Sequence, residues 1–381
     1  MRRRGYLTFL STCFLTIVSI VPLADAAIEM FGYGRSPTIA SLFSRIPSQE
    51  NLRSLESDLG SSSWFPQALR PWWQRLRFTL LADLGEKAVL GRDGWLFYAP
   101  DVRYLVEPFP PATSDAKDDD PLSAIIAFRD QLSHKGIRLL VVPMPVKPSV
   151  YPDKLTRRVA SGGQSFSSHT LELISKLKAA GVEVSNLFET FRGLREKNSL
   201  SESEPYYLVR DTHWSGKAVI IAAEEVAAQI RRLGWIDSGS TDYGLKAVMV
   251  KRRSDVAQMV KTPGIEEKYP PEDVLCYQVV QETDSKPYQD DPHSPVLVLG
   301  DSFLRIYQRD EPTAAGFISH LAMKLRRPLA SIVNDGGAST LVRQELARRA
   351  EILQGKQLVI WEFVERDIRF GMEGWKEVSL P

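Results

Sequence analysis

A serine near the C-terminal third of the chain stands where a nucleophile could act. Four apolar residues run into Gly300, and Asp301 and Ser302 follow directly. Glycine permits a sharp turn, so the Ser302 hydroxyl could point out of a sheet while nearby amides face a reacting carbonyl. The same residues also suit an ordinary turn capped by serine. The assignment therefore needs a base and an acid elsewhere.

Asp211 and His213 are the best acid and base. In an extended segment their spacing puts both side chains on one side, where the carboxylate can bind imidazole Nδ1 and leave Nε2 free. Ser215 is a suitable N-cap for a helix that Gly234 closes. The N-terminal end of this helix carries a partial positive charge, which disfavours a protonated His213 beside it. We therefore expect His213 to be a neutral base near pH 7. A capping Asp211 beside a packed His213–Trp214 pair is the alternative.

Three other residues follow apolar runs. Asn334 follows LASIV, so its amide could join that of Ser302 in an oxyanion site, although an Asn-Asp-Gly-Gly turn needs no such function. Lys147 and Tyr151 follow VVPMP and could line the same cleft. A surface position beside two prolines is the alternative for the lysine. The His, Cys and Asp residues have no metal-ligand spacing, so we expect neither a metal nor a cofactor.

Apolar runs alternate with helical periods along the chain. This predicts an α/β fold with a parallel sheet and helices on both faces. Ligands bind beyond the carboxyl ends of such strands, and Ser302, Asn334, Lys147 and Tyr151 follow predicted strands. The predicted strands are RLLVVPMP (138–145), VEVSNLF (182–188), PVLVLG (295–300), LASIVN (329–334) and QLVIWEF (357–363), and the predicted helices cover 122–132, 170–177, 215–233 and 340–353.

The N-terminus has the pattern of an export signal. Three arginines precede an apolar stretch, and Ala24-Asp25-Ala26 follows with small-x-small spacing. We expect residues 1–26 to be a signal peptide cleaved before Ala27. An uncleaved anchor is the alternative, because the stretch approaches the roughly 20 residues that span a bilayer.

Residues 27–84 are predicted to be a linker and helical lead-in, with a polar, Ser-rich stretch from Ser41 to Ser63. The following WWQRLRF (72–78) could contact a polysaccharide or a membrane, or pack on the domain by its aromatic face. The 48 basic and 47 acidic residues nearly cancel, which disfavours nucleic-acid binding. Cys13 lies in the export segment, so only Cys276 would remain after cleavage and no internal disulfide could form.

Two of these motifs together resemble a known family. Asp211-Thr212-His213-Trp214 and Gly300-Asp301-Ser302-Phe303 are similar to motifs in the SGNH-hydrolase-like domain of the alginate O-acetyltransferases AlgJ and AlgX. The resemblance covers roughly residues 85–368 and includes three more stretches in the same order, GRDGWLFY (91–98), VPMPVKPSVYPDKL (142–155) and VIWEFVERDI (359–368). As in that family, and unlike an ordinary SGNH hydrolase, the acid and base precede the nucleophile.

The resemblance implies that Ser302 is the nucleophile, His213 the general base and Asp211 its orienting acid, with Asp301 structural. It implies a periplasmic O-acetyltransferase that modifies an exported, alginate-like polysaccharide through an acyl-serine. A membrane-bound O-acyltransferase would be the partner that supplies acetyl groups. The catalytic domain would cover 85–370 and a tail 371–381, without the C-terminal carbohydrate-binding module of AlgX, which makes the chain closer to AlgJ.

Other functions stay open at this point. The same triad with water as acceptor gives a carbohydrate acetylesterase, because the difference lies in how the cleft excludes water and seats a sugar. A polysaccharide-binding or purely structural component of an export complex would differ from both in lacking activity. Neither the polysaccharide nor the accepting hydroxyl follows from the sequence.

Overall fold

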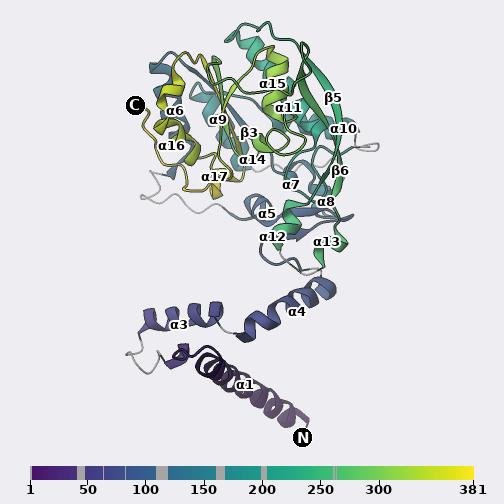
Figure 1. Cartoon of the computed structure of the whole chain (residues 1–381), viewed down its shortest axis with the longest axis vertical. Helices are drawn as coiled ribbons and strands as arrows, with labels where there is room; N and C mark the ends of the chain where they lie inside the picture. Colours follow the sequence, from purple (N-terminus) through teal and green to yellow (C-terminus); the bar gives the residue numbers. More distant parts are fainter. Residues whose placement is uncertain are drawn as a thin grey trace. The chain divides into compact units, whose positions relative to one another are not determined.

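The computed structural model describes residues 2–40, 48–62, 64–81, 83–108, 119–159, 168–198, 204–260, 262 and 264–381. Contacts divide the chain into a smaller unit (residues 1–83 with 262–264) and a larger unit (84–261 with 265–381). The smaller unit contains the helices α1 (Arg2–Ala27), α3 (Gln49–Ser62) and α4 (Trp64–Leu81) (Figure 1). Within the Ser-rich stretch 41–63 of the predicted linker, residues 41–47 and 63 lie outside the described residues, and α3 covers most of the remainder.

A five-stranded parallel sheet forms the centre of the larger unit (Figure 1). Its strand order is β4-β3-β9-β7-β8, and every pairing is parallel. The strands are β3 (Arg138–Met144), β4 (Glu183–Val184), β7 (Val296–Gly300), β8 (Ala330–Val333) and β9 (Leu358–Val364). The strands β7 and β9 are buried along their whole length, as expected for a parallel sheet covered on both faces. The predicted α/β class is confirmed.

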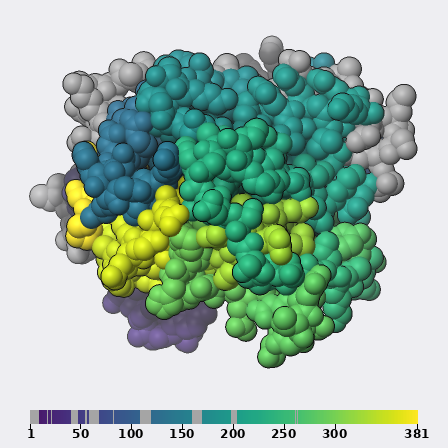
Figure 2. Space-filling model, turned by 90° about the horizontal axis from the view of Figure 1, so that it is seen from above, coloured from purple at the N-terminus to yellow at the C-terminus, as the bar shows by residue number. Residues whose placement is uncertain are grey.

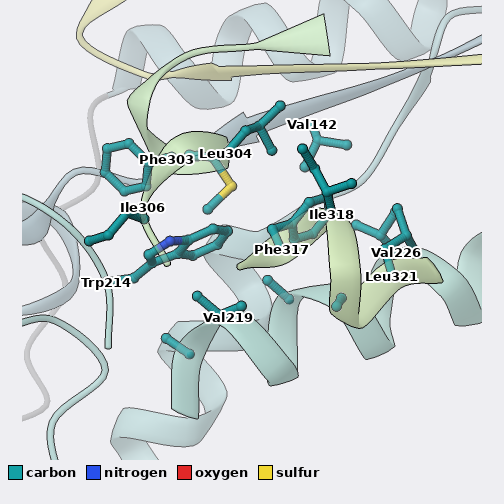
Figure 3. Close-up of a cluster of buried hydrophobic side chains, with 14 of the residues drawn as sticks. Val142, Trp214, Val219, Val226, Phe303, Leu304, Ile306, Phe317, Ile318 and Leu321 are labelled. Atoms are coloured by element: carbon teal, nitrogen blue, oxygen red, sulfur yellow. The ribbon is translucent and has the colours of Figure 1, made fainter. Parts of the chain in front are cut away.

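Alternate residues of the strands enter two separate cores. Val296 and Val298 of β7 belong to one core, whereas Leu297 and Leu299 belong to the other. The first core includes side chains of α11 (Gly216–Leu233) and α15 (Phe317–Leu325), and Figure 3 shows this packing around Trp214. The second includes side chains of α6 (Pro121–His134), α9 (Ser168–Ala179) and α16 (Leu341–Arg348). Helices therefore cover both faces, as predicted.

The helix α11 ends as its sequence predicts. The Ser215 hydroxyl accepts a hydrogen bond from the Ala218 amide at 3.5 Å, and Gly234 closes the helix with a left-handed φ of 60°. The Cβ of any other residue at Gly216 would lie 2.5 Å from the Leu275 carbonyl oxygen. Glycine thus lets the first turn of the helix approach a neighbouring strand closely.

Two regions differ from the expectation. The predicted strand 182–188 is wrong beyond its first residues, because β4 covers only Glu183–Val184 and α10 (Leu187–Asn198) begins at its end. A short apolar run does not distinguish a strand from a helix. The sequence also gave no sign of the antiparallel hairpin of β5 (Tyr243–Arg252) and β6 (Glu272–Gln281). Most of β5 is exposed or half-buried, so no apolar run marks it.

The last residues of the chain pack on the larger unit. In Figure 2 the C-terminal segment, in yellow, lies against the blue surface of α6. The Gln131 side chain of α6 donates to the Val378 carbonyl at 3.1 Å and accepts from the Leu380 amide at 2.6 Å. Trp375 is buried in the second core and donates from Nε1 to the Asp367 carbonyl at 2.7 Å. The segment 371–381 is thus fixed to the domain.

Glu365 joins the carboxyl ends of two central strands. Its amide donates to the Met144 carbonyl, and its carboxylate accepts from the Val146 amide, both at 2.8 Å. The Ser149 and Thr170 hydroxyls also donate to this carboxylate. Burial raises the pKa of Glu365 to about 7.

The raised pKa of Glu365 predicts a loss of stability with rising pH. Unfolding returns the pKa to its ordinary value near 4.5, so the folded state holds a proton that the unfolded chain releases. The contribution of protonated Glu365 to the free energy of unfolding is fully present below about pH 4.5 and is lost as the pH rises through 7. Glu365→Gln should therefore reduce the decline in unfolding free energy across this range by up to about 3 kcal/mol.

Urea unfolding at several pH values measures this change. Glu351→Gln is the matched control, because that glutamate is exposed. An identical pH dependence in the parent and Glu365→Gln would show that the folded state does not hold this proton.

Candidate active site

The structure brings Ser302, His213 and Asp211 into one chain of hydrogen bonds. His213 Nε2 lies 2.9 Å from Ser302 Oγ, and His213 Nδ1 lies 2.7 Å from Asp211 Oδ1. Asp211 and His213 are buried, whereas Ser302 is half-buried and so remains accessible to solvent. These contacts have the geometry of a nucleophile, a base and an orienting acid.

The serine lies at a tight junction between β7 and the short helix α14 (Ser302–Arg305). Asp301 caps this helix by accepting from the Phe303 amide at 2.8 Å. The Cβ of another residue at Gly300 would lie 2.3 Å from Glu362 Oε2, which itself accepts from the Asp301 amide at 3.1 Å. A side chain at position 300 would therefore displace the buried Glu362 carboxylate and Leu304, and Asp301 has a structural contact.

The acid and base lie on a bent loop, so the expected extended segment is wrong. Tyr207 and Trp214 pair across the base of the loop as an isolated antiparallel bridge. Between them the chain bends, and the His213 amide donates to Asp211 Oδ1 at 3.1 Å. The two side chains meet because the aspartate turns back onto the backbone two residues ahead.

Buried charged side chains hold this loop. The Lys147 ammonium donates to three loop carbonyls, those of Leu208 (3.1 Å), Val209 (3.3 Å) and Asp211 (2.6 Å). The Glu272 carboxylate accepts from two loop amides, those of Val209 (3.0 Å) and Arg210 (2.7 Å). An irregular loop has few backbone partners of its own, so these side chains supply hydrogen bonds that a helix or strand would form within itself.

Lys147 and Tyr151 are buried beneath the loop. The surface alternative for Lys147 is wrong, and burial lowers its pKa to about 8. The Tyr151 hydroxyl accepts from the Tyr206 amide at 2.7 Å, and its ring packs on Trp95 with centroids 4.6 Å apart. Both side chains therefore support the acid–base loop from inside the domain.

Sequence reasoning missed two residues that contact the acid–base pair. Arg252 Nε donates to Asp211 Oδ2 at 3.0 Å, and Asp255 Oδ2 lies 3.4 Å from His213 Nδ1. Thr212 links the two sides: its hydroxyl donates to Asp255 and lies 3.1 Å from His213 Nδ1. Arg252 ends β5 and Asp255 begins α12 (Asp255–Val260), so no local spacing could have revealed these contacts.

Two carboxylates set the charge of His213. Burial opposes the imidazolium, but the Asp211 carboxylate at Nδ1, joined by that of Asp255, outweighs burial and raises the pKa of His213 to about 9. The contact with His213 and the charge of Arg252 overcome burial at Asp211 and lower the pKa of that carboxyl well below its usual range. The expected neutral base near pH 7 is wrong, because adjacent full charges outweigh the partial charge of the helix end.

The same residues form one group that could hold a metal ion. Ligand atoms of Asp211, His213 and Asp255 lie within 4.8 Å of one another. Both Asp211 oxygens already accept hydrogen bonds, one of them from the Arg252 cation, and Asp255 accepts from Thr212. A guanidinium beside the group opposes a second cation, so this donor set fits a hydrogen-bonded triad better than a metal centre.

Asn334 lies beside the nucleophile turn. It follows β8, and its amide donates to the Gly300 carbonyl at 3.0 Å. Its side-chain oxygen faces Gly337, where a Cβ would lie only 2.4 Å from it. Asn334 is therefore close to Ser302 in the fold, and its oxyanion role stays a prediction.

Comparison with known proteins identifies the family. The family model described as the SGNH hydrolase-like domain of acetyltransferase AlgX matches residues 88–365, which is most of the chain. The chain belongs to the AlgX family. This result confirms the family resemblance and the SGNH-like fold.

Curated relatives of this AlgX-family chain are named probable alginate O-acetylase AlgJ. The protein of Pseudomonas aeruginosa is 25% identical over 171 residues, which cover 45% of this chain and 40% of that protein. The protein of Azotobacter vinelandii is 23% identical over 303 residues, which cover 77% of this chain and 73% of that protein.

Solved structures of the AlgX family share the fold. The O-acetyltransferase domain of Pseudomonas putida AlgJ matches with a TM-score of 0.56 and 22% identity, over 74% of this chain and 91% of that one. Pseudomonas aeruginosa AlgX matches with a TM-score of 0.54 and 18% identity, over 73% of this chain and 62% of that one.

The second carboxylate at His213 gives a direct test. Asp255→Asn removes one negative charge beside Nδ1, so the pKa of His213 should fall from about 9 toward 6.5. Asp211→Asn should lower it further, because Asp211 is the closer carboxylate. NMR titration of isotope-labelled histidine measures the pKa, and the resonance of exposed His293 serves as an internal control. An unchanged His213 titration in Asp255→Asn would show that Asp255 does not act on this ring.

Proposed function

We propose that this protein transfers acetyl groups to hydroxyls of an exported polysaccharide through an acyl-serine on Ser302. The observation that carries the proposal is the continuous hydrogen-bonded chain from Arg252 through Asp211 and His213 to Ser302. It lies in a domain whose family model is described as an acetyltransferase. The names of the curated relatives support a polysaccharide acceptor of the alginate class.

In the first step Ser302 takes the acetyl group from its donor. Neutral His213 accepts the Ser302 proton at Nε2 while Oγ attacks the acetyl carbonyl. The tetrahedral intermediate collapses, its bond to the leaving group breaks, and the imidazolium returns the proton to that group. The Asp211 carboxylate accepts a hydrogen bond from the Nδ1–H of His213 throughout and stabilises the imidazolium. The backbone amide of Ser302 and the side-chain amide of Asn334 are the candidate donors to the oxyanion, since the backbone amide of Asn334 already donates to the Gly300 carbonyl.

In the second step a sugar hydroxyl replaces the leaving group. His213 takes the proton of that hydroxyl as it attacks the acetyl-serine, and then returns the proton to Ser302 Oγ as the ester bond breaks. The acetylated sugar leaves and the triad is restored. Water in place of the sugar would make the same site an acetylesterase, so the acceptor decides the reaction class.

We also infer where this reaction takes place. The segment Phe9–Gly32 has a mean hydropathy of 1.8 and the length of a membrane span, and it suits either an export signal or an anchor. This supports a periplasmic location. Acetyl-CoA is cytoplasmic, so the family resemblance points to a membrane-bound O-acyltransferase that presents the acetyl group, and the polysaccharide is the second partner.

The covalent step has a direct test. Brief incubation with p-nitrophenyl acetate should add one acetyl group, detected by intact-mass spectrometry and mapped to Ser302. Ser302→Ala and His213→Ala should lose the adduct, because one lacks the nucleophile and the other the base. Ser331→Ala, which alters a half-buried serine on β8, is the matched control. Absence of any adduct or turnover in the parent would overturn the proposal.

The acceptor is tested separately on the trapped acetyl-enzyme. Decay that transfers acetyl to an added uronic-acid oligosaccharide supports the transferase. Decay to free acetate alone, with no acetylated sugar, assigns the site to an acetylesterase instead.

The raised pKa of His213 predicts a strong pH dependence. Only neutral imidazole can accept the Ser302 proton, and at pH 7 about one His213 in a hundred is neutral. The rate of adduct formation should rise about tenfold per pH unit and level off near pH 9. The rate measured with Ser302→Ala is subtracted as background at each pH. A midpoint near the ordinary histidine value of 6.5 would contradict the charge assigned to His213.

A further inference from the structure

The helix α4 (Trp64–Leu81) carries an apolar stripe that the proposed function does not use. Leu69, Trp72, Trp73 and Leu80 follow helical spacing and so lie on one face. Their exposed fractions are 43%, 62%, 54% and 70%. Two adjacent exposed tryptophans between leucines form an apolar surface that water solvates poorly.

The opposite side of α4 is packed. Phe78 projects about half a turn away from the stripe and is only 6% exposed. Among the large apolar side chains of α4 that the structure describes, Phe78 is buried and the aromatic pair is exposed. A helix that packed on protein by its tryptophans would have the reverse pattern, with these rings buried.

Basic side chains border the stripe. Arg70 and Arg75 lie to either side of it by helical position, and both are exposed. The sequence of α4, WFPQALRPWWQRLRFTLL, contains three arginines and no acidic residue. Aliphatic and aromatic side chains on one face with arginines at its edges are typical of helices that lie in a membrane interface.

The smaller unit contains a second feature that points to a bilayer. The segment Phe9–Gly32 is apolar enough to cross a membrane and is only 6% buried. The helix α1 (Arg2–Ala27), which forms most of this segment, contacts α4. A stripe beside such a segment is placed where a lipid surface would cover it. Sugar stacking would use the flat rings and leave the flanking leucines exposed.

We propose that the aromatic stripe of α4 binds an anionic lipid bilayer. Trp72 and Trp73 insert at the level of the headgroups, where indole rings bury their apolar body and keep the N–H in contact with polar groups. Arg70 and Arg75 bind lipid phosphates. This surface is independent of the acyl-transfer site, and it would hold the chain to the membrane in addition to α1.

Fluorescence quenching of the full-length chain tests the stripe. The protein is reconstituted into vesicles of phosphatidylcholine and phosphatidylglycerol whose acyl chains carry bromine, which quenches tryptophans at the interface. The parent and all variants are made in a Trp64→Phe background, so that α1 and α4 contain no tryptophan besides Trp72 and Trp73, and most of the quenching should then be lost in the Trp72→Phe/Trp73→Phe double variant. Trp235→Phe, which removes a half-buried tryptophan of the larger unit, should quench like the parent.

Lipid charge tests the arginines. Arg70→Gln/Arg75→Gln should reduce quenching in the mixed vesicles to the level seen with phosphatidylcholine alone, whereas Arg70→Lys/Arg75→Lys should retain most of it.

Equal bromolipid quenching of the parent and the tryptophan double variant would overturn the proposal. So would protection of both tryptophans from bromolipid and from aqueous acrylamide, which would place the stripe against protein. Protection from acrylamide by added polysaccharide alone would assign it to a glycan. None of these measurements uses activity, so they stand whether or not the acyl-transfer proposal holds.

Discussion

The site depends on one constraint: an irregular buried loop must have its backbone hydrogen bonds satisfied. The loop from Leu208 to His213 is irregular and receives a strand hydrogen bond at Val209, whose carbonyl accepts from the Leu96 amide at 2.9 Å, yet the loop carries both the acid and the base. Lys147 binds its carbonyls and Glu272 binds its amides, each from a different element. Because each bond involves a charged group and is at least partly buried, each is stronger than a neutral surface contact. They fix the loop against the sheet and so fix where His213 points.

The charges that hold the loop also define its chemistry. Asp211 is buried, and Arg252 and His213 share its two oxygens, so the carboxylate is kept ionised. Asp255 adds a second negative charge at the same imidazole. A histidine with two neighbouring carboxylates becomes a strong base that is mostly protonated at neutral pH. His213 is therefore a stronger base than an ordinary histidine, but only a small fraction of it is in the neutral form that can accept the Ser302 proton.

The turn that carries Ser302 is held by close packing, whereas the acid–base loop is held by charged side chains. Ser302 is placed by a buried strand, a glycine with no room for a side chain, and the Asp301 cap. Beneath it Phe303 packs against the His213 ring, with centroids 5.1 Å apart, and against Trp214 (Figure 3). Apolar packing thus sets the distance between nucleophile and base, while buried charges set the orientation of the base. A half-buried serine beside buried partners suits a group that must meet an acyl donor.

The sequence by itself determined the parallel sheet, the capped helix α11 and the positions of Ser302, Asp211 and His213 at the ends of apolar runs. Buried strands and helix caps leave local patterns of apolar, glycine and serine residues, so these features are readable from neighbours in the chain. Arg252 and Asp255 left no such pattern. Arg252, at the end of an exposed hairpin strand, reaches Asp211, and Asp255, at the start of α12, reaches the His213 ring, and both approaches are decided by tertiary contacts. The local Asp211–His213 pair could therefore be read from the sequence, whereas only the tertiary structure added the second carboxylate, because electrostatic interactions depend on distance in space and not on spacing in the chain.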